Sequence, residues 1–210
     1  MSDGRVRFCS ACGAPVIRRL VEADARERDV CSACGAIHYQ NPRILVTCIV
    51  EHQGRILLCQ RAQAPAIGRW TTPAGFMEIG ESLQQAAVRE THEECGVVLD
   101  ENALDLHMVS SIPWMGEVYV CFTARAPSAD VAAGPESQDV RYFDEHDIPW
   151  DELAFVETRG YLQIYLSERA RHHHTIHVTN VDARGGRRRA YHVAGVSDVF
   201  EADPASSRPR

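Results

Sequence analysis

Two matched cysteine motifs near the N-terminus constrain the fold of this chain more than any other feature. Residues 9–13 have the sequence Cys-Ser-Ala-Cys-Gly, and residues 31–35 repeat it unchanged. Each Cys-x-x-Cys pair can place two thiolates around one metal ion, and the glycine that follows permits a tight turn. The 18 residues between the pairs fit the spacing of a four-cysteine zinc site. We therefore predict a zinc ribbon over residues 1–40, with one structural Zn²⁺ bound by Cys9, Cys12, Cys31 and Cys34.

The alternatives to zinc are a redox Cys-x-x-Cys motif and coincidence. A redox motif normally occurs once, near a βαβ unit, whereas this motif occurs twice. Four protein ligands would leave no coordination position open for a substrate. We expect this zinc to stabilise the fold and to take no part in the chemistry.

The other four cysteines lie scattered among apolar residues: Cys48, Cys59, Cys95 and Cys121. We expect small buried thiols at these positions, as is usual for free cysteine. The first residues lack the apolar core of a signal peptide, and no apolar run approaches the ~20 residues that span a bilayer. These features predict a cytoplasmic protein without a membrane segment.

The charge pattern excludes several functions. The net charge is −7 and all 22 basic residues are arginine. An acidic chain is a poor nucleic-acid binder because phosphate attraction needs a basic face. Without lysine the chain has no P-loop lysine, no Schiff-base lysine and no kinase lysine. These features argue against nucleic acid as a partner, and the sequence leaves open whether the chain forms a homodimer.

Residues 41–170 carry the pattern of a mixed α/β domain. Runs rich in apolar and β-branched residues predict strands at residues 43–50, 55–60, 104–111, 117–126 and 140–143. Ser82 and Gln85 form a candidate capping box, which predicts a helix that ends at Cys95 and Gly96. Apolar spacing predicts a second helix over residues 151–170.

Residues 171–210 differ in character from the domain that precedes them. Residues 175–181 and 190–196 flank a glycine- and arginine-rich segment, a pattern compatible with a terminal hairpin. The last residues, 203–210, are rich in Pro, Ser and Arg, which predicts disorder. We therefore interpret residues 171–210 as a C-terminal extension.

The chemistry of the chain is concentrated in residues 75–97, a glycine loop that leads into an acidic helix. Glu90, Glu93 and Glu94 stand at i, i+3 and i+4, so their carboxylates share one helical face. Three like charges repel unless a cation lies among them, and such oxygen-rich clusters suit Mg²⁺ or Mn²⁺. By themselves, the glutamates would fit a solvated acidic surface better than a metal site.

The spacing of the whole segment favours a metal site instead, because it resembles the Nudix signature G-x5-E-x7-R-E-U-x-E-E-x-G-U, where U is a bulky apolar residue. The matching positions are Gly75, Glu81, Arg89, Glu90, Glu93, Glu94, Gly96 and Val97. Thr91 at the first U is a mild departure. With the zinc ribbon included, the resemblance covers roughly residues 8–170. It implies an α/β/α sandwich with a mixed sheet, and water attack on a diphosphate phosphorus.

Carried over by position, the resemblance also implies a metal site. Glu90 and Glu94 would be the principal ligands of a catalytic Mg²⁺ or Mn²⁺, and Glu93 an additional ligand with a catalytic role. The backbone carbonyl of Ala74 or Gly75 would complete the site.

The resemblance implies further roles around that metal. Arg89 would hold the neighbouring carboxylates in place, including Glu81, which is grouped with the metal site. Arg61 would bind substrate phosphate or be a structural surface arginine. The base that deprotonates the water lies either in the box or in a later loop, where Glu136 is the candidate and Asp139 the second choice. An ordinary acidic loop explains Glu136 equally well.

The segment after the box bears on the substrate. Zinc-ribbon Nudix proteins similar to NADH pyrophosphatases carry S-Q-P-W-P-F-P-x-S there. Residues 111–114 match its opening, whereas residues 115–119 depart from the rest. Pro113, 16 residues beyond Val97, and residues 148–155 resemble the ADP-ribose or FAD pyrophosphatases instead. We therefore expect ADP-ribose or FAD as the substrate, with NADH as the alternative.

The sequence alone leaves open the roles of two tryptophans. It also leaves open a second class of function. Trp70 and Trp114 would stack on a flat base or be ordinary core residues. A nucleotide-sensing or nucleic-acid-binding regulator is the alternative to an enzyme. Sensors related to Nudix enzymes typically lose the box glutamates, which are all present here, and acidic neighbours dilute the arginines of the ribbon.

Overall fold

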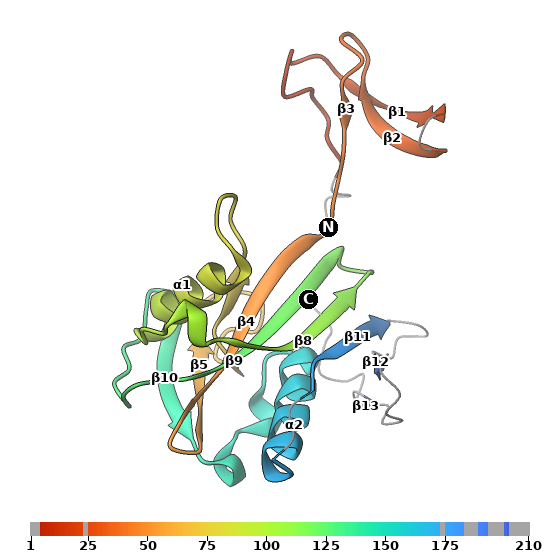
Figure 1. Cartoon of the computed structure of the whole chain (residues 1–210). Coiled ribbons are helices and arrows are strands. Elements are labelled where there is room, and N and C mark those ends of the chain that lie inside the picture. The colour runs from red at the N-terminus through yellow and green to blue at the C-terminus, as the bar shows by residue number, and fades with distance from the viewer. Residues whose placement is uncertain (1–4, 23–24, 173–174, 183–188, 193–199, 202–210) are drawn as a thin grey trace. The chain divides into compact units, whose positions relative to one another are not determined.

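The computed structural model describes residues 5–22, 25–172, 175–182, 189–192 and 200–201. The chain forms two compact units, Met1–Pro42 and Arg43–Arg210 (Figure 1). The arginine-rich turn and the C-terminal disorder expected from the sequence lie outside the described residues. Among the residues described, no helix is long and apolar enough to cross a membrane.

The first unit is a small three-stranded sheet with antiparallel pairing between neighbours. Its strands are β1 (Val16–Val21), β2 (Arg26–Cys31) and β3 (Ile37–His38). Val16 pairs with Cys31, so the register brings the residues after the first cysteine motif beside the second motif. Gly13 and Gly35 have φ of 73° and 74°, a left-handed conformation that glycine adopts without steric cost.

The second unit contains a ten-stranded sheet in the order β10-β5-β4-β9-β8-β11-β12-β13, with β6 paired to β5 and β7 to β4. Its strands are β4 (Arg43–His52), β5 (Arg55–Arg61), β6 (Trp70–Thr71), β7 (Ala74–Phe76), β8 (Asp105–Ile112), β9 (Glu117–Arg125), β10 (Ser137–Phe143), β11 (His177–Asp182), β12 (Arg189–His192) and β13 (Phe200–Glu201). The pairs β4–β9 and β8–β11 are parallel and the others antiparallel, so the sheet is mixed.

Helices α1 (Leu83–Cys95) and α2 (Val156–Ala170) cover opposite faces of this sheet (Figure 1). Successive side chains of a strand point to opposite faces. Along β4, Val46 and Cys48 accordingly belong to the apolar cluster that contains the buried face of α1. Ile49 belongs to the cluster that contains Leu162 of α2. The α/β/α sandwich with a mixed sheet is therefore confirmed.

Helix α1 begins and ends as its sequence predicts. The Ser82 hydroxyl accepts a hydrogen bond from the Gln85 backbone N–H, and the Gln85 side chain accepts one from the Ser82 N–H. Gly96 ends the helix in a left-handed conformation with φ 71°. Both ends of the helix are confirmed, and they fix the orientation of the acidic face.

Helix α2 begins later than predicted, and the predicted start at residue 151 is wrong. A short 3-10 helix, Trp150–Glu152, comes first, and α2 starts at Val156. Between them Leu153 is extended and forms a bridge with Trp70, and the Ala154 N–H donates to the Trp70 carbonyl. Burial against β6 therefore overrides the helical apolar spacing of this segment.

Strands β4 and β5 separate beyond their turn, and this split in the sheet places the glycine loop against α1. The two strands pair only next to their turn, at Glu51–Ile56 and His52–Arg55. Farther along, β7 pairs with β4 and β6 pairs with β5, and the Cys48 N–H donates to the Pro73 carbonyl. The connection between β6 and β7 thus fills the split and delivers Ala74–Phe76 to the acidic helix.

Candidate active site

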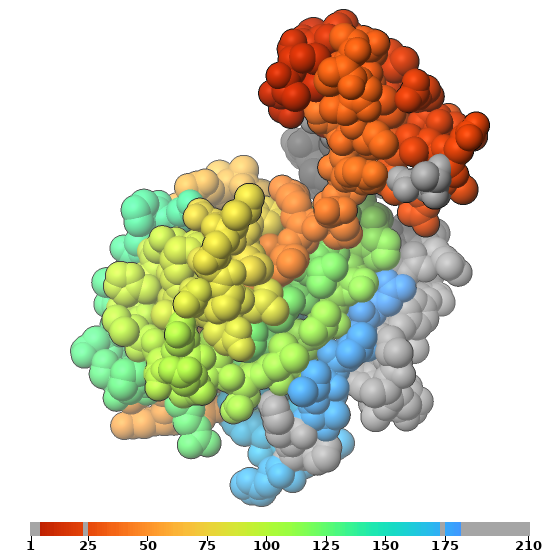
Figure 2. All heavy atoms as spheres, turned by 45° about the horizontal axis from the view of Figure 1, so that its top comes forward, coloured from red at the N-terminus to blue at the C-terminus, as the bar shows by residue number. Residues whose placement is uncertain are grey.

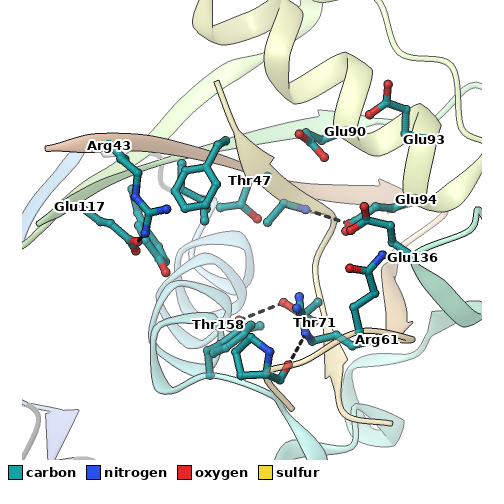
Figure 3. Close-up of a pocket in the computed structure, with 18 of the residues that line it drawn as sticks. Arg43, Thr47, Arg61, Thr71, Glu90, Glu93, Glu94, Glu117, Glu136 and Thr158 are labelled. Atoms are coloured by element: carbon teal, nitrogen blue, oxygen red, sulfur yellow. Dashed lines mark hydrogen bonds and ion pairs between the residues drawn. The ribbon is translucent and has the colours of Figure 1, made fainter. Parts of the chain in front are cut away.

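A pocket of about 630 Å³ opens in the second unit, and residues of β4, β7, β9, α1 and α2 line it. Figure 3 shows Glu90, Glu93 and Glu94 of α1 on one side of it and Arg43 with Glu117 on the other. The volume is in the range of small-molecule sites in proteins, about 300–1,000 Å³. The pocket can therefore hold a substrate of nucleotide size against an acidic wall.

Arg89 organises the carboxylates of that wall. Its Nε and Nη2 donate to the two oxygens of Glu81, at 3.1 and 2.8 Å. Its Nη1 donates to Glu90 at 2.7 Å and to Glu93 at 3.0 Å, while Nη2 also reaches the Phe76 carbonyl. These contacts raise the pKa of Arg89. One guanidinium thus positions three carboxylates relative to the glycine loop.

Glu94 is the most deeply buried of the three glutamates on the acidic face of α1, with 7% of its surface exposed. Burial raises its pKa to about 7, and repulsion from Glu90 adds to the shift. The Ala74 N–H donates to its Oε2 at 3.0 Å, and the Cys59 thiol lies 3.6 Å from the same oxygen. A buried carboxylate that is this weakly compensated favours a bound cation.

Glu90 lies against the glycine loop. Burial raises its pKa; Arg89 opposes the shift, whereas Glu93 and Glu136 add to it. A Cβ on Gly75 would lie 2.1 Å from the Glu90 carboxyl carbon, a separation that no real side chain tolerates. Any larger residue at this position would therefore displace the Glu90 carboxylate. The donor set, carboxylates and nearby carbonyls, fits Mg²⁺ or Mn²⁺.

Glu136 reaches the pocket from a loop that packs against the end of α1. At Gly134 a Cβ would lie 1.7 Å from the Glu93 carbonyl oxygen, and the Gly134 N–H donates to the Glu94 carbonyl. This contact fixes the loop, and Glu136 lines the pocket together with Arg61. Arg61 donates to the Pro65 carbonyl at 2.8 Å and stacks over Phe155 at 5.2 Å.

The structure gathers most of the site residues expected from the sequence. The pocket lining includes Ala74, Gly75, Arg89, Glu90, Glu93, Glu94, Arg61 and Glu136. Glu81 is connected to this group through Arg89. Asp139, the second choice of base, pairs with Arg141 on β10 and is not part of the lining.

The residues that were expected to contact the base of the substrate do not line the pocket. Trp70 is buried, 6% exposed, and packs edge-on against Phe143 with ring centroids 5.0 Å apart, so the core alternative describes it. Pro113 and Trp114 lie in the turn between β8 and β9, and the pocket lining contains Met115 and Glu117 of that region instead. Stacking of a base on either tryptophan therefore has no support in this pocket.

Hydroxyl groups form a part of the pocket that the sequence did not reveal. Thr47, Thr71, Thr158 and Tyr161 line it. The Tyr161 hydroxyl is 2.6 Å from the Thr72 hydroxyl and donates to Thr158 at 3.1 Å, and Thr47 is 2.7 Å from Thr72. These residues come from β4, β6 and α2, so no local motif connects them.

The four cysteines of the first unit converge on one point. The sulfur–sulfur distances are 3.7 Å for Cys9–Cys34, 3.4 Å for Cys12–Cys31 and 3.6 Å for Cys12–Cys34. Tetrahedral Zn–S bonds of about 2.3 Å place the sulfurs about 3.8 Å apart. The four cysteines are thus positioned to bind zinc.

Comparisons with known proteins agree with this geometry. The family model described as NUDIX domain matches residues 40–163, and the model described as Nudix N-terminal, a zinc ribbon, matches residues 7–40. A crystal structure of a NUDIX hydrolase from Nitrosomonas europaea is 42% identical with a TM-score of 0.80, and the match covers 84% of this chain and 99% of that one.

Two curated relatives carry functional names. An NAD-capped RNA hydrolase, NudC, from Stutzerimonas stutzeri is 33% identical over 171 residues, 78% of this chain and 57% of that protein. An ADP-ribose pyrophosphatase from Methanocaldococcus jannaschii is 32% identical over 120 residues, 56% of this chain and 69% of that protein. The chain spans about half the length of the NAD-capped RNA hydrolases that it matches.

Proposed function

Because this chain belongs to the Nudix hydrolase family, we propose that it cleaves the diphosphate bond of ADP-ribose or FAD with the help of Mg²⁺ or Mn²⁺. The pocket supplies the required groups: an acidic wall for the metal, and Arg61 for a phosphate. AMP is then one of the products.

The residues divide the work according to their positions. Glu90 and Glu94 bind the metal, Glu93 assists, and Arg89 keeps their carboxylates in place. A metal ion held by these carboxylates would neutralise charge on the phosphate oxygens and lower the pKa of the attacking water. Glu136, on the loop that packs against the end of α1, accepts the proton of that water.

The substrate preference rests on one observation, the tight turn between β8 and β9. The Met115 N–H donates to the Ile112 carbonyl at 3.1 Å, and the Gly116 N–H to the Pro113 carbonyl at 3.2 Å. Gly116 closes the turn with φ 67°. In the sequence, this turn follows the box where the resemblance would place the proline-rich segment of NADH pyrophosphatases. Strand β9 then presents Glu117 and Tyr119 to the pocket.

NADH or an NAD-capped RNA is the second candidate substrate. It is favoured by the relatives named NAD-capped RNA hydrolase, which are 30–34% identical to this chain. The net charge of −7 weighs against an RNA, but the names of these relatives require that an RNA substrate be tested.

A substrate panel tests the proposal. Purified protein is assayed with Mg²⁺ or Mn²⁺ on ADP-ribose, FAD, NADH, NAD-capped RNA and nucleoside triphosphates, with Glu94→Gln as the inactive control. We expect kcat/KM for ADP-ribose or FAD to exceed that for NADH by about tenfold. That ratio needs only about 1.4 kcal/mol of differential transition-state binding. A preference for NADH or capped RNA selects the second candidate, and hydrolysis of triphosphates alone rejects both.

A further inference from the structure

A second cluster of metal-ligating side chains lies in the second unit, outside the catalytic pocket. His107 of β8, Glu168 of α2 and His177 of β11 each direct one ligand atom to a common point, and the three atoms lie within 4.8 Å of one another. The side chains are 0%, 13% and 8% exposed. Figure 2 shows β11 (blue) directly beside β8 (green), in agreement with their parallel pairing.

The hydrogen bond that His107 makes away from the cluster determines its tautomer, that is, which ring nitrogen carries the proton and which presents a lone pair to the cluster. Its Nε2 lies 3.2 Å from the Tyr161 carbonyl oxygen, which can only accept, so Nε2 carries the proton. In the neutral ring Nδ1 then presents its lone pair toward Glu168. Metal-bound histidines commonly donate their second N–H to a backbone carbonyl in this way, which fixes the ring.

The ligand atoms lie close enough for a single small cation to bind after small shifts of the side chains. His177 Nε2 is 2.7 Å from one Glu168 oxygen, a hydrogen-bond distance, and His107 Nδ1 is 3.9 Å from the other. Tetrahedral bonds of about 2.1 Å place ligand atoms about 3.4 Å apart, so a bound metal would require His177 and Glu168 to separate slightly and His107 to approach. The 3.9 Å separation exceeds the usual hydrogen-bond range of about 2.7–3.2 Å, whereas two ligands of one metal can have it after a small shift.

We propose that His107, Glu168 and His177 form a second structural metal site, which binds Zn²⁺ and attaches β11 to α2 and β8. Two imidazole nitrogens and one carboxylate are ligands that Zn²⁺ accepts readily. His107 of β8 is distant in sequence from Glu168 and His177, so the metal would cross-link β8 to the segment that contains α2 and β11. This site is separate from the catalytic glutamates and from the cysteine ribbon.

Elemental analysis of the full-length protein, loaded with Zn²⁺ alone and then dialysed, tests the proposal. We expect about two zinc ions per chain, one at the four cysteines and one at the cluster of His107, Glu168 and His177. His177→Gln should retain about one. His146→Gln is the matched control, because His146 is 79% exposed and far from the cluster in sequence, and it should retain both.

Two further variants distinguish a metal site from a plain hydrogen-bond network and from zinc bound elsewhere on the chain. Glu168→Gln keeps the side-chain shape and a hydrogen bond to His177 but removes the charge. A metal site loses its zinc in this variant, whereas a hydrogen-bond network does not depend on the charge. The chain also contains three consecutive histidines, residues 172–174, which can bind zinc adventitiously. Replacing all three with Gln should leave the second zinc in place.

Hydrolysis by each variant, assayed with saturating Mn²⁺, reports whether the second unit is folded. The proposal is overturned if the wild-type protein holds only one zinc. It is also overturned if Glu168→Gln and His177→Gln, both folded, hold as much zinc as wild type, or if the second zinc disappears with residues 172–174. These results leave the proposed hydrolase activity unaffected, so the two proposals fail separately.

Discussion

At Gly75 the backbone of β7 passes so close to Glu90 that a Cβ would lie 2.1 Å from its carboxyl group. We predict that Gly75→Ala displaces Glu90 from its position beside Arg89 and lowers kcat. A misplacement of about 1 Å in a catalytic group costs on the order of 100-fold, so we expect a loss of about 10- to 100-fold. Steady-state kinetics at saturating metal and substrate measures it.

Gly160 provides the matched control for this substitution. It lies inside α2, and a Cβ there would meet no atom within 4 Å. Gly160→Ala should keep normal kcat and raise the free energy of unfolding by up to about 1 kcal/mol, because alanine favours the helix. Equal losses of activity in the two variants would contradict the close-approach argument.

Glu90 and Glu94, which are more buried than Glu93, should matter more for catalysis. Glu90→Gln and Glu94→Gln each remove a proposed metal ligand while keeping its shape, so kcat should fall by orders of magnitude. Glu93 has a side chain that is 56% exposed, and Glu93→Gln should cost less. Near-normal kcat for either buried variant at saturating Mg²⁺ would reject the assigned metal site.

These residues also show what sequence can predict about a site. The i, i+3, i+4 spacing of the glutamates is local, so helix geometry alone brings them together. Thr47, Thr71 and Thr158 meet only because β4, β6 and α2 pack together. Local sequence spacing cannot predict this packing. Trp70 shows the opposite case, since an isolated tryptophan does not reveal whether it packs in the core or lines the pocket.

At the scale of elements, Glu51 connects β4 to α2 and makes their contact sensitive to pH. Burial by itself would raise the pKa of Glu51, but hydrogen bonds from Tyr165 and Arg169, with the charge of Arg125 nearby, lower it below its ordinary value. The donors lie 2.7 and 3.0 Å from Oε2. In the unfolded chain the pKa is about 4.3.

Because the folded-state pKa of Glu51 is lowered, the direction in which pH changes the free energy of unfolding is determined. Between the two pKa values the unfolded chain binds more protons, so the free energy of unfolding falls as pH falls. The contribution of Glu51 is complete above about pH 5 and is lost as pH drops through its folded-state pKa. Denaturant titrations from about pH 7 downward should show wild type and Glu51→Gln converging, whereas a constant difference would exclude this contribution.

Elements were predictable where their signals are local. The capping box and Gly96 define α1, and apolar runs define β4 and β5. The short strands β6 and β7 were not predicted, because Thr72, Pro73 and Gly75 have the composition of a loop and pair only through the split in the sheet. The strands β1 and β2 were missed because arginine and acidic side chains mask their pattern.

At the scale of the whole molecule, the eight cysteines divide between the two compact units. Four are positioned to bind zinc in the first unit. The other four, Cys48, Cys59, Cys95 and Cys121, are buried in the second unit. Burial raises the pKa of the Cys48 and Cys121 thiols, and only the thiolate reacts with an alkylating reagent. The four zinc-site cysteines and the four buried cysteines should therefore become reactive under different conditions.

We predict three levels of alkylation by iodoacetamide, measured by peptide mass spectrometry. Zinc-loaded protein should react slowly at all eight thiols. A chelator should expose Cys9, Cys12, Cys31 and Cys34, because the first unit has little apolar core and depends on its metal for folding. The other four should react only in denaturant, because they are buried in the apolar core of the second unit. Labelling of all eight after chelation would show that folding of the second unit depends on zinc, and labelling of the first four before chelation would exclude a zinc ribbon.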